Sequence, residues 1–241
     1  MQVCLLPQFA LAVDGHIVDL CSRAERVLTY LALQGGTARR ITIAGTLWPD
    51  CAGERALSSL RTALWNLSRM DIPVVHVSPT AVSIRAEVGI DLHQATERAR
   101  DLIDGRCDLA DVRATTRLLR HGLLIDWAED WVIVPQEQFR QLRLHALEAL
   151  AEELLAAGRY AQSVVAGLDA VACEPLRETS HLLLMKAFIA QGNRGAAINQ
   201  YRSCRHLLRD ELGLEPSDEM DMLIRQTLGS RAEHDGVVTV A

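Results

Sequence analysis

Residues 53–70 contain a series of polar side chains suited to hydrogen-bonding another molecule. Their leucines are spaced three and four apart, which predicts a helix whose buried stripe consists of Leu57, Leu60, Leu64 and Leu67. At ~100° per residue the opposite face of such a helix carries short polar groups and arginines. That face comprises Arg55, Ser58, Ser59, Thr62, Asn66 and Arg69, with Arg61 and Trp65 at its flank. On this wheel the face contains no acidic residue, whereas ordinary solvated helix faces usually mix Glu with Lys.

A face of this composition suits the major groove of double-stranded DNA. Asparagine can pair with adenine through two hydrogen bonds, serine and threonine can bond to any base, and arginine reaches guanine or phosphate. The alternative interpretation is a plain solvated helix surface. These eight residues are therefore candidates for a DNA-binding surface, and the family resemblance given below favours DNA contact over the alternative.

Two neighbouring segments add candidate contacts. The stretch Arg39-Arg40-Ile41-Thr42 opens a weaker helix over residues 41–48 and places positive charge where a phosphate could bind. Trp48 lies at the end of that helix and precedes Pro49, so we expect it to anchor the core, and its indole N–H could also reach a phosphate.

A hairpin is predicted over residues 74–85, with the polar tip Ser78-Pro79-Thr80. Thr80 and Arg85 could touch the DNA backbone or the minor groove. A polar hairpin tip is common in proteins of every function, and this alternative stays open.

The elements that position these residues follow from periodicity. Alternating apolar residues, broken by Pro7 and by Asp14-Gly15, predict three short antiparallel strands within the first twenty residues. Ser22-Arg-Ala-Glu25 has the pattern of a capping box, and the helix that follows ends at Gly35-Gly36. Strands, three helices and a terminal hairpin in residues 1–90 are typical of a winged helix-turn-helix, an α+β fold.

Beyond residue 90 the pattern is helical only. Gly158 and Gly192 close similar helices 34 residues apart, which is the spacing of tetratricopeptide repeats. The fold class expected for the whole chain is therefore mainly α, with the winged helix followed by an all-α, tetratricopeptide-like domain. The predicted helices cover residues 92–103, 109–119, 136–157, 159–172, 176–190, 193–212 and 217–228.

The 241 residues carry a formal net charge of −6, and this charge is unevenly distributed. Residues 1–90 hold eight arginines and seven acidic residues, whereas the remainder has a net charge of −7. We predict a DNA-binding domain over 1–90, a helical domain over 91–228 and a disordered tail over 229–241. No apolar run approaches the length of a membrane span and the N-terminus does not resemble a signal peptide, so we expect a cytoplasmic location without membrane contact.

Enzyme chemistry finds little support. The six cysteines lie far apart, without zinc-ligand spacing, and are expected to be buried thiols. The motifs of hydrolases, metalloproteases and dinucleotide-binding enzymes are missing, so we expect no catalysis, metal or cofactor. The acidic cluster from Asp126 to Trp131 has no nucleophile or metal partner in sequence, and its two tryptophans are expected to pack at a domain junction.

Three segments together resemble the Streptomyces antibiotic regulatory proteins. They are Leu47-Trp48-Pro49-Asp50 with Glu54-Arg55-Ala56, Asp130-Trp131-Val132 leading into 139–147, and the stretch 207–216 ending in Gly213-Leu214-Glu215-Pro216. The resemblance covers residues 1–228. The chain departs from the family at Ile125-Asp126, where Pro-Gly is expected, and at Arg39–Thr42, where a Ser cap and an acidic turn are expected.

The resemblance implies a winged-helix transcription activator with a bacterial transcriptional activator domain. Without a Gly-x-x-x-x-Gly-Lys-Ser/Thr motif, the chain resembles the short, stand-alone form of the family. By resemblance it would bind promoter direct repeats as a homodimer, contact RNA polymerase and its sigma factor, associate with the nucleoid, and regulate a biosynthetic gene cluster.

A second hypothesis is a tetratricopeptide-like scaffold whose N-terminal domain has lost DNA binding. The modest charge of residues 1–90 is its best support. The two hypotheses differ in salt dependence, since contacts to several phosphates make duplex affinity fall steeply with salt and a scaffold would not bind a duplex at all.

Overall fold

The computed structural model describes residues 1–70, 73–106 and 109–229, and the predicted tail therefore lies outside the described residues apart from Gly229. Within the described ranges the chain divides into two compact units. The N-terminal unit comprises residues 1–98 and 117–140, and the C-terminal unit comprises residues 99–116 and those from 141 onward. The predicted boundary between residues 90 and 91 stays a prediction. After residue 90 the chain passes from the N-terminal unit to the C-terminal unit at residue 99, back at residue 117, and again to the C-terminal unit at residue 141.

The N-terminal unit begins with a small sheet whose strand order is β3-β2-β1-β7. Its strands are β1 (Gln2–Cys4), β2 (Ala10–Val13), β3 (His16–Val18) and β7 (Gly89–Ile90). The three predicted strands are confirmed, and both residues of the Asp14-Gly15 turn have the positive φ that a tight hairpin needs. The parallel pairing of β7 with β1 was not predicted.

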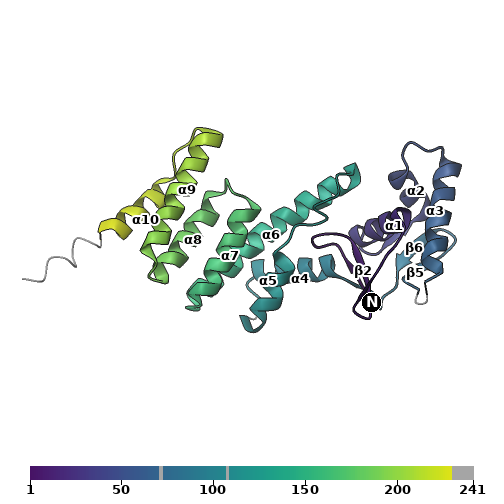
Figure 1. The fold of residues 1–241 in the computed structure, drawn as a ribbon, viewed down its shortest axis with the longest axis horizontal. Helices are drawn as coiled ribbons and strands as arrows, with labels where there is room; N and C mark the ends of the chain where they lie inside the picture. Colours follow the sequence, from purple (N-terminus) through teal and green to yellow (C-terminus); the bar gives the residue numbers. More distant parts are fainter. Residues whose placement is uncertain (71–72, 107–108, 230–241) are drawn as a thin grey trace, which may run out of the picture. The chain divides into compact units, whose positions relative to one another are not determined.

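Three helices and a second sheet complete a winged helix-turn-helix and confirm the predicted fold class (Figure 1). The helices are α1 (Ser22–Leu33), α2 (Arg40–Leu47) and α3 (Gly53–Ser68). The sheet has the order β4-β6-β5, with strands β4 (Thr37–Arg39), β5 (Val75–Val77) and β6 (Ala81–Ile84). Strand β4 was not predicted; it pairs with β6 and thereby holds the start of α2 beside the tip of the hairpin.

The core of this unit forms where α1 packs on α3 and the sheets. Val27, Leu28 and Leu31 of α1 are fully buried, as its apolar spacing predicts. The predicted capping box is wrong, because α1 begins one residue earlier than that pattern requires. Cys21 occupies the N-cap without a side-chain hydrogen bond, and Ser22 is the first helical residue.

A later segment returns to this core. Leu123 and Leu124 are buried in it, and the Leu124 amide donates to the Leu5 carbonyl oxygen at 3.0 Å. The buried Asp91 carboxylate accepts hydrogen bonds from the amides of Leu5 and Leu6 at 2.8–3.1 Å. Burial raises the pKa of Asp91, against the opposing effect of these hydrogen bonds. Residues 117–140 therefore belong to the N-terminal unit because they supply part of its core.

The acidic and aromatic cluster at residues 126–131 is structural. Trp131 makes edge contacts with Trp127 and with Tyr30 of α1, at centroid distances of 5.8 and 5.7 Å. Glu129 accepts a hydrogen bond from Arg26 at 2.7 Å, and the same guanidinium nitrogen donates to the Leu47 carbonyl oxygen. The cluster therefore fastens residues 127–131 to α1 and to the end of α2.

Helices make up the rest of the described chain. These are α4 (Asp91–Ile103), a 3-10 turn (Leu109–Asp111), α5 (Val112–Leu119), α6 (Asp130–Ala156), α7 (Tyr160–Cys173), α8 (Glu178–Ala190), α9 (Arg194–Leu212) and α10 (Asp218–Gly229). Helix α6 begins six residues before the predicted position and contains Pro135. Within the described ranges, none of the helices combines the length and apolar character that a membrane span requires.

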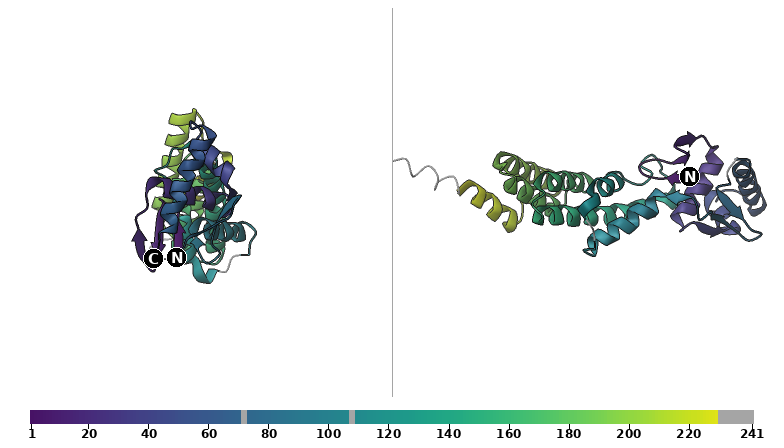
Figure 2. Two further views of the ribbon diagram at one scale, coloured as in Figure 1. Left: turned by 90° about the vertical axis from the view of Figure 1, so that its right-hand side faces the viewer. Right: turned by 90° about the horizontal axis from the view of Figure 1, so that it is seen from below.

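The C-terminal unit stacks α7, α8 and α9 side by side, as both ribbon views show (Figures 1 and 2). Gly158 and Gly192, at the predicted 34-residue spacing, have φ values of 71° and 82°, which a glycine adopts without strain when a helix ends. Between helices, Glu148 accepts hydrogen bonds from Arg177, Thr179 and Ser180 at 2.7–3.0 Å. The predicted all-α, tetratricopeptide-like architecture is confirmed.

Candidate nucleic-acid interface

Helix α3 presents most of the predicted polar residues to solvent. Its buried side consists of Ala56, Leu60, Ala63, Leu64 and Leu67, and Leu57 is half-buried. The exposed predicted residues are Arg55, Ser58, Arg61, Thr62, Trp65 and Arg69. Ser59 and Asn66 are half-buried and lie at the edge of this surface, because the two buried alanines turn the helix slightly from the orientation that the leucines alone predict.

Several of these side chains already have contacts within the protein. Thr62 Oγ1 donates to the Ser58 carbonyl oxygen at 3.1 Å. Asn66 Nδ2 donates to Cys21 Sγ at 3.1 Å, at the start of α1. Sulfur is a weak acceptor, so this contact is readily exchanged for a better one.

At the end of α3 the indole ring of Trp65 is 56% exposed. The Arg69 guanidinium carbon lies 4.7 Å from the centroid of that ring, in a cation–π contact. The structure therefore places Trp65 in the middle of the exposed surface, where the leucine spacing alone had put it at the flank.

The expectation that this face carries no acidic residue is wrong for its first turn. Glu54 is exposed, four residues before Ser58 and seven before Arg61, and so it lies on the same side of α3. The remaining exposed positions of the helix are neutral or basic. Negative charge on this face is therefore confined to the N-terminal end of the helix.

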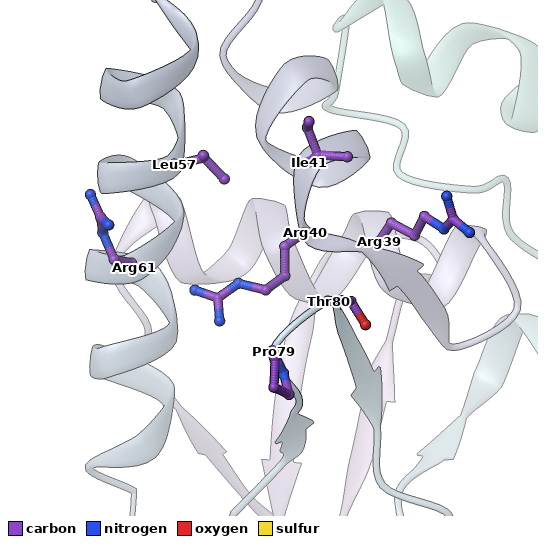
Figure 3. Close-up of a pocket in the computed structure, with 7 residues that line it drawn as sticks. All are labelled: Arg39, Arg40, Ile41, Leu57, Arg61, Pro79 and Thr80. Atoms are coloured by element: carbon purple, nitrogen blue, oxygen red, sulfur yellow. The ribbon is translucent and has the colours of Figure 1, made fainter.

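A groove of about 600 Å³ lies between α3, the start of α2 and the tip of the hairpin (Figure 3). It is lined by Arg39, Arg40, Ile41, Leu57, Arg61, Pro79 and Thr80. Figure 3 shows the Arg40 side chain reaching toward α3 and Arg39 pointing away on the other side of the strand end. Arginines from two helices therefore border one depression, and the described residues that line it include no carboxylate.

Backbone hydrogen bonds between β4 and β6 position the start of α2 next to the hairpin tip, on either side of this groove. The Arg40 amide donates to the Thr80 carbonyl oxygen at 2.9 Å, and Arg40 Nη1 lies 3.4 Å from the Ser78 carbonyl oxygen. The register of β4 on β6 sets Arg39 opposite Ala81. Because β4 was not predicted, the position of Arg39 and Arg40 beside the hairpin tip was not predicted either, although Gly35-Gly36 before them marks a tight turn of the chain.

The structure separates the other predicted residues from this groove. Arg85 follows the last residue of β6, at the opposite end of the hairpin from Thr80, and its Nε lies 3.5 Å from Glu87. Trp48 is half-buried against the core, with the Arg26 guanidinium 6.0 Å from its ring centroid. Thr42 is exposed on the first turn of α2 but does not line the groove.

The described residues also include histidines, cysteines and acidic side chains outside the groove. They contain no group of three or more histidine, cysteine or acidic side chains that could hold a metal ion. Cys173 and Cys204 are buried, whereas Cys21 and Cys51 are exposed, so the expectation of buried thiols is wrong for those two. Cys107 lies outside the described residues.

Comparison with known proteins places these features in a family. The model of the bacterial transcriptional activator domain matches residues 85–228. The regulatory protein AfsR of Streptomyces coelicolor is 30% identical over 227 residues, covering 89% of this chain and 23% of AfsR. AfsR of Streptomyces griseus is 28% identical, covering 86% of this chain and 22% of its own length.

Two further similarities agree with this. The transcriptional regulator RedD of Streptomyces coelicolor is 40% identical over 78 residues, or 32% of this chain and 22% of RedD. The structure of Mycobacterium tuberculosis EmbR, in complex with a low-affinity phosphopeptide, has the same fold with a TM-score of 0.68. EmbR is 20% identical, and the match covers 95% of this chain and 65% of that chain.

The chain spans less than a quarter of the length of the curated relatives that it matches. Most of this chain nevertheless takes part in these matches. The similarity to AfsR covers 89% of it, and the domain model covers more than half of it. The chain therefore belongs to the bacterial transcriptional activator domain family, and most of its length is similar to regulatory proteins of Streptomyces.

Proposed function

We propose that this chain is a sequence-specific DNA-binding transcription activator. In this proposal α3 lies in the major groove and the β5–β6 hairpin tip lies against the adjacent backbone. The observation that carries the proposal is the groove between them, where Arg40 and Arg61 border a depression with no carboxylate among its described lining residues. Within the described residues neither guanidinium makes an ion pair, so both keep hydrogen-bond donors that can bind phosphate.

The proposal divides the candidate residues by role. Ser58, Thr62 and Asn66 would contact base edges from the middle and one edge of α3. Phosphates would be bound by the arginines of the groove and of the helix ends. These are Arg39, Arg40, Arg55, Arg61 and Arg69.

A binding titration over a range of salt concentrations tests this proposal. The probes are a duplex that the protein selects from random sequence and a scrambled duplex of equal length. We expect tight binding to the selected duplex, and affinity for both duplexes that falls linearly on a log–log salt plot, as counterion release requires. Absence of duplex binding even at low salt would leave the protein-interaction scaffold as the better account.

For activation, we infer that two copies bind direct repeats on promoter DNA and contact RNA polymerase and its sigma factor, within the nucleoid of the cytoplasm. Support comes from the family, since the relatives are regulatory proteins and the matched domain is a transcriptional activator domain. One copy offers a single recognition helix and a single hairpin, which gives limited selectivity, so two linked copies are needed for a unique site.

A spacer series between the two repeats tests this arrangement. Repeats centred about one helical turn apart, ~10–11 bp, put both copies on one face of the duplex. Inserting about half a turn between them should abolish cooperative binding and activation, and inserting a full turn should restore part of the binding. Activation that is indifferent to a half-turn insertion would contradict the paired arrangement while leaving DNA binding itself intact.

A further inference from the structure

A second groove, of about 500 Å³, lies between α9 and α10 in the C-terminal unit. Its apolar lining is supplied by Ile198, Tyr201 and Leu228, and its basic lining by three arginines, Arg202, Arg205 and Arg209, together with His206. The three arginines follow one another at intervals of three and four residues along α9 and therefore share one face of that helix. All three are exposed.

This groove already binds one carboxylate. Arg205 Nε donates to one oxygen of Glu215 at 2.8 Å, and Arg209 Nε donates to the other at 3.0 Å, with a further contact from Arg209 Nη2. Hydrogen bonds from Arg209 and Arg205 hold the pKa of Glu215 below its ordinary value. The geometry therefore suits carboxylate groups.

The three arginines carry more positive charge than the single carboxylate of Glu215 can neutralise. Two guanidinium groups share the single carboxylate of Glu215, and within the described ranges Arg202 makes no ion pair. These three arginines and Glu215 together carry an excess of two positive charges, and Asp210 and Asp221 lie beside them. The positive charge that a ligand can meet is therefore confined to the guanidinium groups, on a part of the chain whose net charge is negative.

The surroundings favour a peptide over a nucleic acid. Asp221 accepts a hydrogen bond from the Tyr201 hydroxyl, and Asp210 lies 3.1 Å from His206 Nδ1, so carboxylates flank the arginines on both helices. A continuous phosphate backbone would meet these acids as well as the arginines, whereas a short peptide can place its carboxylates at the arginines and neutral side chains at the acids. Leu228, 51% exposed at the groove, offers an apolar contact to a side chain but nothing to a phosphate.

We propose that this groove binds a short acidic segment of a partner protein, one that carries aliphatic residues among its carboxylates. Its carboxylates bind Arg202 and the guanidinium groups that share Glu215, and its aliphatic side chains pack on Ile198 and Leu228. The site goes beyond DNA binding and does not depend on it. It gives the C-terminal unit a surface through which the chain recognises another protein by charge and by apolar contact.

Fluorescence anisotropy with the full chain tests the proposal. The probe is a short labelled peptide of alternating glutamate and leucine, and a peptide with glutamine in place of glutamate is the control. We expect Arg202→Glu to weaken binding of the acidic peptide ~10-fold, because it reverses a charge in contact with the ligand. Arg194→Glu changes the same charge on α9 outside the groove, and we expect it to alter the affinity by less than ~2-fold.

A second variant tests whether the peptide binds at the groove arginines themselves or responds only to the overall charge of the chain. Glu215→Gln frees two guanidinium groups, so it should tighten binding of the acidic peptide ~5-fold. The proposal is overturned if the glutamine peptide binds equally well, if Arg202→Glu and Arg194→Glu act alike, or if a single-stranded oligonucleotide displaces the peptide from the groove. Duplex binding, measured in parallel, should be unchanged by Arg202→Glu, so a failure here is distinguishable from a failure of the proposed DNA binding.

Discussion

The two compact units use arginine in different ways. On α3 and in its groove, Arg39, Arg40, Arg55, Arg61 and Arg69 make no ion pair within the described ranges. In the C-terminal unit, by contrast, Arg177 pairs with Glu148, and Arg205 and Arg209 pair with Glu215. The first group is available to a polyanion, whereas much of the second group already holds a carboxylate.

This difference shows that net charge is a poor guide to what a surface binds. Residues 1–90 carry almost as many acids as arginines, which on charge alone weakens the case for DNA binding. In the structure, however, Asp14 and Asp19 are on or after the first hairpin, Glu87 is beside Arg85, and Glu54 is confined to the N-terminal end of α3. Local pairing, and not the sum, decides which guanidinium groups a ligand can reach.

The largest expected effect is the loss of duplex affinity when two arginines of the N-terminal unit that make no ion pair within the described ranges are replaced. The double variant Arg40→Ala/Arg61→Ala should lose ~100-fold in duplex affinity at about 0.1 M salt and reduce the log–log salt slope by about 2, since each phosphate contact contributes nearly one counterion. The matched double variant Arg205→Ala/Arg209→Ala should change neither quantity. Equal losses in the two double variants would show that general charge, and not the α3 groove, determines duplex binding.

A second prediction concerns the paired arginines. Glu148→Ala should destabilise the C-terminal unit by ~2 kcal/mol, because Arg177 and Ser180 would lose their common acceptor in a partly buried position. Urea unfolding monitored by helical ellipticity measures this change. Lys186→Ala breaks the exposed pair with Glu219 and should cost less than ~0.5 kcal/mol. Similar costs for both variants would indicate that the Glu148 network contributes no more than a surface ion pair.

The pH dependence of stability should differ in sign between the units. In the C-terminal unit His181 is buried, its Nε2–H donates to the Pro175 carbonyl oxygen at 2.8 Å, and its Nδ1 accepts from Gln200 at 2.7 Å. Burial lowers the pKa of His181 in the folded state. As pH falls below the unfolded value near ~6.5, the unfolded chain binds the proton first, and the C-terminal unit loses stability.

The pKa shifts of Glu148 and Asp91 predict the same difference between the units, in the pH dependence of stability, at lower pH. Although burial opposes it, the hydrogen bonds from Arg177, Ser180 and Thr179 lower the pKa of Glu148, so its contribution is also lost on acidification. Burial instead raises the pKa of Asp91 in the N-terminal unit, so the folded state binds that proton first and acidification favours folding there.

Two optical signals distinguish the units in this experiment. All four tryptophans lie in the N-terminal unit and report its unfolding by fluorescence, while helical ellipticity also follows the C-terminal unit. His181→Gln should flatten the pH dependence of the ellipticity transition between about pH 7 and 5. An unchanged slope in that variant would exclude His181 as its source.

Much of the fold could be predicted because it is encoded locally. The Asp14-Gly15 turn, the leucine spacing of α3 and the repeated glycines at 158 and 192 each act within a few residues. Strands β4 and β7 could not be predicted, since they are three and two residues long and depend on partners distant in sequence. The return of Leu123 and Leu124 to the N-terminal core is likewise a long-range packing effect, which no local pattern specifies.

The candidate site was only partly predictable for the same reason. A helical wheel finds the exposed side of α3, but the exact rotation of the helix depends on how Ala56 and Ala63 pack. Their burial moves Trp65 to the middle of the exposed surface and Asn66 to its edge. The groove itself needs the β4–β6 pairing, so Ile41, Leu57 and Pro79 had no signal in the sequence as lining residues.

The smallest expected effect concerns base reading at that edge. Asn66 donates to Cys21 Sγ in the free protein, so contact with a base must replace this weak bond. We therefore expect Asn66→Ala to reduce affinity for the selected duplex ~5-fold, at the lower end of the range for a base contact, and to leave the scrambled duplex unaffected. Thr62→Ala, nearer the middle of the face, should have at least as large an effect on the selected duplex alone.

Cys21 offers a way to sharpen this last prediction. Cys21→Ala removes the internal acceptor without changing α3, so the Asn66 amide no longer gives up a bond when it contacts DNA. Affinity for the selected duplex should then rise slightly, and the penalty of Asn66→Ala should be larger in the Cys21→Ala background than in the natural chain. A double-mutant cycle of the two positions on both duplexes measures this coupling. If Asn66→Ala lowers affinity for the selected and the scrambled duplex equally, Asn66 does not read a base, and the selectivity of α3 rests on Ser58 and Thr62.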